Sequence, residues 1–169
     1  YRFDKTDTIN LDLINSTNSI KRRYSMNILV SACLLGINCR YDGSGEYLPA
    51  LDKLKEKHCL IPFCPECYGG LPTPRTPAEI SGGRVATKDG EDVTEQYNKG
   101  ASEALRLAKT LDCKAAILKS RSPSCGFGAI YDGSFSKRLV SGNGIAAELL
   151  YKSGINVIAD EDEDKISAL

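Results

Sequence analysis

The sequence predicts an α/β fold: a single domain of three layers built on a mostly parallel, Rossmann-like sheet. Short apolar runs typical of buried strands alternate along the chain with segments of helical periodicity. The length of 169 residues fits one ordinary domain, and no internal repeat is apparent. Right-handed crossovers in such a fold bring the carboxyl ends of all strands to one edge of the sheet.

Composition limits the classes of function. An apolar content of 41% and a charged content of 26% are typical of soluble globular proteins. The formal net charge is zero, which argues against stable binding to nucleic acid. No apolar run approaches the roughly 20 residues that span a bilayer. Seven cysteines without a visible signal peptide predict a cytoplasmic protein with free or metal-bound thiols. Composition leaves the oligomeric state open.

The N-terminal segment differs from the rest of the chain. Residues 1–25 lack clean periodicity and end in a basic cluster, and Met26 directly precedes the first convincing strand. We therefore expect residues 1–25 to be a non-native or disordered extension, with a targeting peptide as the alternative. The α/β domain is then expected over residues 26–160, followed by a solvated acidic tail over residues 161–169.

The first half of the domain predicts two strands and one helix. Residues 27–32 and 59–63 are short apolar runs, and leucines recur at helical spacing within residues 48–57. Residues 64–75 hold too much proline and glycine to predict regular structure. A hairpin is expected over residues 83–94, turning at Asp89-Gly90.

The second half predicts the same alternation. Small and apolar residues at helical spacing indicate a helix over residues 95–112, with Thr94 as its N-cap. A strand is expected over residues 114–119, then a turn-rich excursion, a helix over residues 145–152 and a last strand over residues 155–159.

Three cysteines follow three predicted strands. Cys33 comes directly after the first strand, Cys64 directly after the second, and Cys125 a few residues after the third. Ligands of open α/β sheets bind at the carboxyl ends of strands, near the topological switch point. Cysteine is also a common buried residue, which suits Cys59 and Cys113 better than a cysteine in a polar turn. The sequence therefore predicts one shared sulfur site.

Several cofactors fit such a site. Structural zinc prefers four ligands in paired C-x-x-C knuckles, and this chain has one such pair, Cys64 and Cys67, with a single histidine. Three cysteines on an iron–sulfur cluster would leave one iron free to act as a Lewis acid towards a soft substrate sulfur. A thioredoxin-like dithiol is a further option, although no helix pattern begins at Cys64. A non-enzymatic zinc or persulfide-carrying module and a thiol–disulfide oxidoreductase thus stay open as alternatives.

Polar residues near these cysteines have possible roles. Glu66 could relay protons to water or substrate. Ser122 and Ser124 could donate to a substrate or cluster sulfur, or simply form a turn. Asp42-Gly43 is expected to be a turn rather than a catalytic carboxylate. Four cations could neutralise a cluster or be solvated: Arg40, Arg75, Lys119 and Arg121.

Three motifs carry a family resemblance. They are Ser31–Gly36 with Arg40–Gly43, then Cys64–Glu66 with Gly69–Arg75 and Pro77–Glu79, and finally Lys119–Gly126. With these motifs in this order, residues 26–159 resemble the thiouracil desulfidase (TudS-like) family.

The resemblance implies a cofactor and a reaction. The cofactor would be a 4Fe–4S cluster on Cys33, Cys64 and Cys125, with one iron not bound by protein. The reaction would be non-redox hydrolysis of the C–S bond of a 2-thiouracil-like thiolated pyrimidine, giving a uracil-type product and hydrogen sulfide. Glu66 would handle protons and Ser122 would supply a substrate-side hydroxyl. A free base, a nucleoside and a nucleotide all fit a small polar pocket.

Overall fold

A computed structural model describes residues 25–169, so the expectations for residues 1–25 lie outside the described residues apart from Ser25. The centre is a parallel sheet with the strand order β2-β1-β5-β8. Its strands are β1 (Asn27–Ser31), β2 (Cys59–Phe63), β5 (Cys113–Leu118) and β8 (Asn156–Ala159). Val30 pairs with Ile117 of β5 on one side and Pro62 of β2 on the other. Pro62 is tolerated because β2 is an edge strand. The α/β fold class with a mostly parallel sheet is confirmed.

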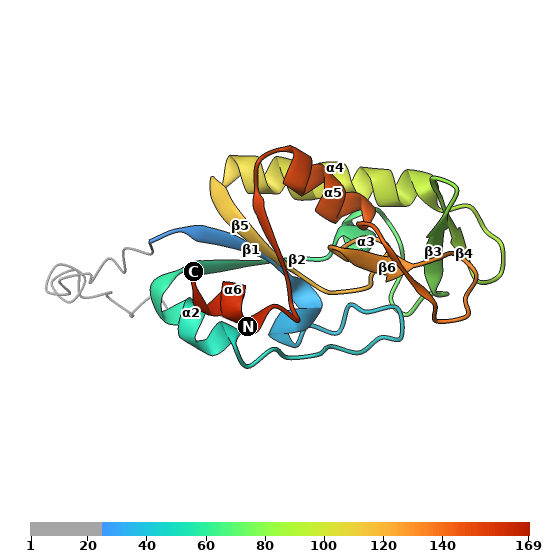
Figure 1. Ribbon diagram of the computed structural model, residues 1–169. Helices are drawn as coiled ribbons and strands as arrows, with labels where there is room; N and C mark the ends of the chain where they lie inside the picture. The colour runs from blue at the N-terminus through green and yellow to red at the C-terminus, as the bar shows by residue number, and fades with distance from the viewer. Residues whose placement is uncertain (1–24) are drawn as a thin grey trace, which may run out of the picture.

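Helices cover both faces of the sheet, which gives three layers (Figure 1). One face carries α4 (Thr94–Thr110) and α5 (Ile145–Lys152). The opposite face carries α2 (Leu51–Lys57) and α6 (Glu163–Ser167). These layers enclose the sheet in a single small domain.

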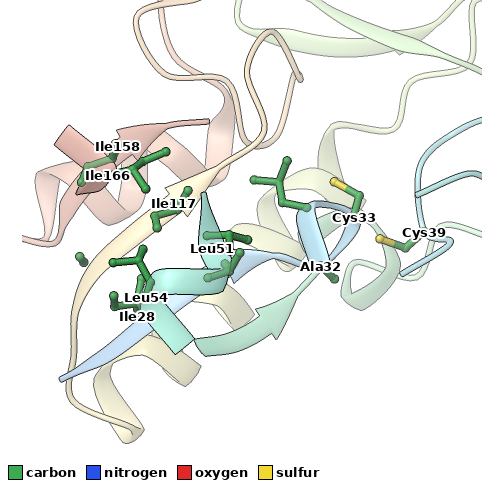
Figure 2. Packing of buried hydrophobic residues seen from close by; sticks show 12 residues of the cluster. Ile28, Ala32, Cys33, Cys39, Leu51, Leu54, Ile117, Ile158 and Ile166 are labelled. Atoms are coloured by element: carbon green, nitrogen blue, oxygen red, sulfur yellow. The ribbon is translucent and has the colours of Figure 1, made fainter. Parts of the chain in front are cut away.

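Alternating side chains of the strands explain the two cores. Ile28 and Val30 of β1 lie in a cluster with Leu54 of α2. The intervening Leu29 points to the other face and packs with Ala104 of α4. Figure 2 shows that the first cluster runs from Ile28 and Leu54 towards Cys33, so the core leads directly to the predicted sulfur site.

Two small antiparallel hairpins extend the fold beyond the sheet (Figure 1). They are β3 (Ala78–Ser81) with β4 (Arg84–Thr87), and β6 (Ala129–Tyr131) with β7 (Leu139–Ser141). The hairpin predicted over residues 83–94 was wrong in its pairing, because β4 pairs with β3 across Gly82-Gly83. The turn at Asp89-Gly90 does exist, and it allows only a single bridge between Ala86 and Asp92.

A short helix, α3 (Pro65–Tyr68), begins where irregular structure was expected. Pro65 suits the first helical position, where its missing N–H costs no hydrogen bond. Gly100 of α4 lets α3 approach closely, because a Cβ there would lie 2.0 Å from the Pro65 carbonyl oxygen. Contact with α4 therefore stabilises a helix that is too short for a periodic signal.

The C-terminal segment is not the solvated acidic tail that was predicted. Asp160 is buried, and residues 163–167 form α6, whose N-terminus is capped by the Asp162 side chain. Ile166 is only 1% exposed and belongs to the same core cluster as Ile158 and Ile28. Ile166 thus docks α6 on the sheet, and Leu169, two residues after the end of the helix, packs against the same cluster.

Replacing Ile166 by alanine is expected to lower the free energy of unfolding by about 2–4 kcal/mol, because it leaves a cavity in the core. Equilibrium denaturation in urea measures this change. The exposed neighbour Ser167 offers a control, since Ser167→Ala should change stability little. If Ile166→Ala unfolds like the unmodified protein, α6 does not contribute to the cooperative core.

The other elements lie close to their predicted bounds. The first turn of the helix predicted over residues 48–57 is not helical, since α2 begins at Leu51. Val93, not Thr94, takes the N-cap position of α4, and the Thr94 hydroxyl accepts the Val85 N–H instead, at 2.9 Å. Within residues 25–169, no helix is both long and apolar enough to cross a membrane.

Candidate functional site

The three cysteines predicted to share a site all follow the carboxyl ends of strands. Cys33 lies in the 3-10 helix η1 (Ala32–Leu35), which continues directly from β1. Cys64 occupies the N-cap position of α3, directly after β2. Cys125 lies in the loop after β5. Since the chain leaves β1 and β5 towards opposite sides of the sheet, their carboxyl ends form its topological switch point.

Two further cysteines join this group. The Cys39 thiol interacts with the thiols of Cys33 and Cys64, and Figure 2 shows Cys39 beside Cys33 at the end of the core. The Cys64 and Cys67 sulfurs approach the Cys39 carbonyl oxygen at 3.8 and 3.9 Å. Cys125 is near enough to interact electrostatically with Cys64. Five thiols therefore gather in one region of the site.

The remaining cysteines, Cys59 and Cys113, lie elsewhere. They are the first residues of β2 and β5 and flank Asn27 on either side. Cys113 is buried and Cys59 is half-buried. Both positions agree with the expectation that these two cysteines are ordinary strand residues.

Their surroundings raise the pKa values of Cys39, Cys64 and Cys125, which favours the neutral thiols. Burial raises the pKa of Cys125, and the Ser31 hydroxyl partly opposes this shift. The pKa of Cys64 is raised mainly by its contact with Cys39 and then by burial. Contact with Cys33 is the main cause that raises the pKa of Cys39 to about 11. Thiolates at these positions therefore need a compensating positive group.

The donor set fits an iron–sulfur cluster by its chemistry. Thiolate sulfur is the characteristic ligand of such clusters. The Ser124 hydroxyl beside Cys125 is fully buried and has no hydrogen-bond partner among the described residues, so it could donate to a sulfur. Across residues 25–169, no group of three or more cysteine, histidine or acidic side chains is arranged to hold a single metal ion.

Glu66 and Ser122, the two predicted catalytic residues, are in contact. Glu66 Oε1 accepts a hydrogen bond from the Ser122 hydroxyl at 3.3 Å. Glu66 Oε2 accepts one from Arg75 Nε at 2.8 Å, and both side chains of this ion pair are largely buried, with 13% and 7% exposed. One oxygen of the carboxylate is thus fixed by Arg75, while the other faces the serine.

Ser122 also shapes the turn that carries Cys125. Its hydroxyl oxygen accepts the backbone N–H groups of Ser124 and Cys125 at 3.0 and 3.1 Å. The hydroxyl proton is directed at Glu66. Sequence analysis offered turn formation and a functional hydroxyl as alternatives, and the geometry accommodates both.

Sequence reasoning assigned no specific role to Arg75 and did not identify Tyr97. Besides Glu66, the Arg75 guanidinium donates to the carbonyl oxygens of Cys39 and Pro72 at 3.1 and 3.2 Å. Tyr97 of α4 is 2% exposed and its hydroxyl interacts with Glu66. Burial raises the pKa of Tyr97, so the phenol keeps its proton as a donor. Arg75 lies in a predicted motif, whereas Tyr97 resembles any core residue of an amphipathic helix.

Asp160 is a further residue of this region that sequence analysis did not single out. Its carboxylate accepts hydrogen bonds from Lys119 Nζ and from the Ser120 backbone N–H, both at 2.7 Å. Burial alone would raise the pKa of Asp160, but hydrogen bonds from Lys119 and Ser120 outweigh it and the net shift is downward. Asp160 therefore ties β8 to the start of the third motif.

The four cations considered from the sequence all have carboxylate partners. Arg75 pairs with Glu66 and Lys119 with Asp160. On the surface, Arg40 pairs with Glu46 at 2.5 Å and Arg121 with Glu161 at 2.6 Å. The segment Asp42-Gly43 is the expected turn, since the Ser44 N–H donates to the Asp42 carboxylate.

A cavity of about 480 Å³ adjoins this site. Glu66, Ser122 and Tyr97 contribute to its lining, as do Tyr131 and Phe135 from the region of the second hairpin. The volume suits a small-molecule ligand. Glu66 lies two residues after Cys64 and Ser122 three residues before Cys125, so these two lining residues connect the cavity to the thiols.

The fold and the site define a small α/β protein with a cysteine-rich centre at the switch point of a parallel sheet. A family model described as 2-thiouracil desulfurase matches residues 28–162, and the chain belongs to this family. The uncharacterized protein YbbK of Bacillus subtilis (strain 168) is 44% identical over 149 residues, which are 82% of this chain and 99% of YbbK.

A solved structure is also similar to this chain. It is that of TudS, a [4Fe-4S]-dependent thiouracil desulfidase. The TM-score is 0.80 and the sequence identity 42%, over 85% of this chain and 96% of TudS. Sequence and fold therefore lead to the same family.

Proposed function

We propose that the protein is an iron–sulfur-dependent desulfidase that removes sulfur from 2-thiouracil-like thiolated pyrimidines by non-redox hydrolysis. The products would be a uracil-type pyrimidine and hydrogen sulfide. The observation that carries this proposal is the contact between Glu66 and Ser122 at a cavity beside the gathered thiols. Membership of the 2-thiouracil desulfurase family and 42% identity to TudS support it.

The proposed ligands of the cluster are Cys33, Cys64 and Cys125. A 4Fe–4S cluster held by these three cysteines would supply, at an iron without a protein ligand, a Lewis acid suited to a soft sulfur. The Ser31 hydroxyl interacts with the Cys125 sulfur and also accepts the Lys119 N–H at 3.0 Å. Such outer hydrogen bonds orient ligand side chains and support their charge.

Glu66 is the proposed acceptor of the proton of the attacking water. Arg75 holds one carboxylate oxygen, which leaves Oε1 on the Ser122 side to act as a general base. Water oxygen bonds to the thiocarbonyl carbon, the C–S bond breaks, and both water protons end on the departing sulfur as hydrogen sulfide. The electron count is unchanged, so no reductant is needed.

Ser122 is the proposed hydroxyl on the substrate side. In the structure its proton points to Glu66, and rotation about the C–O bond lets it donate to a bound heterocycle instead. Two backbone N–H groups hold the hydroxyl oxygen in place, so the donor is fixed before substrate binds.

Anaerobic reconstitution followed by an assay with 2-thiouracil tests the function directly. We expect a brown protein that releases sulfide and uracil in equal amounts without an electron donor. Quantification of iron, acid-labile sulfide and both products measures this. A protein with full cluster occupancy and no sulfide release would overturn the desulfidase proposal, and bound zinc in place of iron would favour the non-enzymatic module.

One observation favours a second candidate, a thiol–disulfide oxidoreductase. Cys64 is the N-cap residue of α3 and Cys67 lies in the single turn of this helix, an arrangement that redox dithiols use. However, the pKa values of Cys64 and Cys67 are both raised, whereas reactive redox cysteines need a stabilised thiolate. The dithiol reaction requires Cys67, so its replacement separates the two functions.

A further inference from the structure

Glu79 of β3 is a buried carboxylate that the proposed reaction does not use. Its residue is 8% exposed, and the side chain contributes to the lining of the cavity. Glu79 Oε2 accepts two backbone hydrogen bonds, from the N–H groups of Gly133 and Phe135, each at 3.0 Å. Both donors lie in the connection between β6 and β7, residues 132–138, which we call the β6–β7 loop. One carboxylate oxygen therefore joins the two hairpins.

The β6–β7 loop has an unusual backbone that needs such support. Phe135 and Lys137 adopt positive φ angles of 56° and 64°, which residues other than glycine rarely adopt. Such strained backbone conformations persist only where the surrounding structure holds them in place, and they are concentrated at ligand sites. Gly133 packs against the end of β3, because a Cβ there would lie 2.8 Å from the Ile80 carbonyl oxygen. The loop is thus held on β3 by close packing and by the Glu79 carboxylate.

This conformation brings an aromatic ring to the cavity. Phe135 lines the cavity that Glu66 and Ser122 also line, although it comes from a different part of the fold. Phe135 is only half-buried, so its side chain is not part of the hydrophobic core of the domain. A flat heterocycle gains affinity by packing against an aromatic face, whichever base it is.

We propose that Glu79 is a positioning residue that holds Phe135 in the cavity wall, where its ring packs against the pyrimidine ring of the substrate. The β6–β7 loop thereby sets the preference of the site for a flat heterocycle. The identity of that heterocycle rests on the proposed function. The hydrogen bonds from Gly133 and Phe135 to Glu79 do not.

The chemistry of the carboxylate suggests the variants. Both N–H groups donate to the same oxygen, so the single carbonyl oxygen of glutamine can replace it. Glu79→Gln should therefore keep the loop in place, whereas Glu79→Ala removes the acceptor. Phe135→Ala removes the ring and leaves the acceptor intact. Glu103→Ala, on the exposed side of α4, is the matched control.

The experiment uses the full chain with its cluster reconstituted anaerobically, and it has two readouts. Hydrogen exchange with mass spectrometry follows residues 132–138, and steady-state kinetics with 2-thiouracil and binding of uracil follow the cavity. Among the single variants, we expect only Glu79→Ala to show faster hydrogen exchange over residues 132–138. KM and the Kd for uracil should rise about tenfold in both Glu79→Ala and Phe135→Ala, with kcat changed less than about twofold. The double variant Glu79→Ala/Phe135→Ala should bind uracil no more weakly than Phe135→Ala does, because both changes act on the same ring.

The possible failures are distinguishable. If the unmodified protein turns over 2-thiouracil while Glu79→Ala keeps its KM, uracil affinity and exchange, the inference is wrong and the function stands. If the unmodified protein has a full cluster but neither binds uracil nor releases sulfide, the proposed function and the role of Phe135 both fail. Should Glu79→Ala not fold, an unchanged KM in Phe135→Ala would overturn the inference by itself.

Discussion

Replacing Cys125 by serine is expected to prevent cluster assembly and to lower desulfidase turnover by more than roughly 100-fold, beyond the loss typical of an outer hydrogen-bond partner. Cys125 is 6% exposed, and the turn around it is fixed by two hydrogen bonds to Ser122. A serine hydroxyl is a hard donor that binds iron–sulfur clusters poorly. Iron and acid-labile sulfide content after anaerobic reconstitution, together with sulfide release, measure the effect.

Two other cysteines supply the controls for Cys125→Ser. Cys113 is also buried, at 3% exposed, but lies at the start of β5 rather than after its end, so Cys113→Ser should keep the cluster. Cys67→Ser should retain most of its turnover, whereas the dithiol mechanism requires that this variant be inactive. A full cluster in Cys125→Ser would show that Cys125 is not a ligand.

Replacing Glu66 by glutamine is expected to lower kcat by about 10²–10⁴-fold, which is the usual contribution of a positioned acid or base. Glutamine has nearly the same shape and can still accept the Arg75 hydrogen bond, but it cannot take a proton from water. Steady-state kinetics with 2-thiouracil measure kcat, and the visible spectrum reports whether the cluster is retained.

The surface residue Glu103 gives the matched control for Glu66→Gln. Its carboxylate pairs with Arg106 on the exposed side of α4, away from the cavity lining, so Glu103→Gln should leave kcat unchanged. Full turnover in Glu66→Gln with normal cluster content would exclude Glu66 as the general base.

The sheet could be predicted from sequence because its strands are buried on both faces. Such strands are continuous apolar runs, and Ala115 to Leu118 of β5 are all at most 2% exposed. The placement of Cys33 and Cys64 then followed from parallel topology alone, since Cys64 directly follows β2 and only Ala32 separates Cys33 from β1. The expectation that parallel strands end at the same edge of the sheet was thus sufficient to predict that these distant cysteines lie at one edge.

What the sequence did not predict depends on contacts between distant segments. The helix α3 has four residues, too few for a periodic pattern, and it forms against Gly100 of α4. Likewise α6 docks on the core through Ile166, which lies within an acidic segment. Neither contact leaves a local signal in the chain.

The missed side chains of the site have the same explanation. Arg75 and Tyr97 act on Glu66 through space, and the local sequence around either residue does not specify that partner. Their residue types indicated only a cation in a loop and an aromatic in a helix. The contact of Tyr97 with Glu66 depends on the packing of α3 on α4, and that of Arg75 depends on the path of the loop after α3, neither of which sequence periodicity describes.

The link between Asp160 and the third motif has a consequence for biosynthesis. A ribosome makes Lys119 and Ser120 before it makes β8, so their buried partner does not yet exist when they emerge. Until β8 pairs with β5, the loop that carries Cys125 lacks one of the anchors of its first residues. If the proposed cluster is bound, the loop that carries Cys125 therefore gains its full set of anchors for the cluster only after the synthesis of β8.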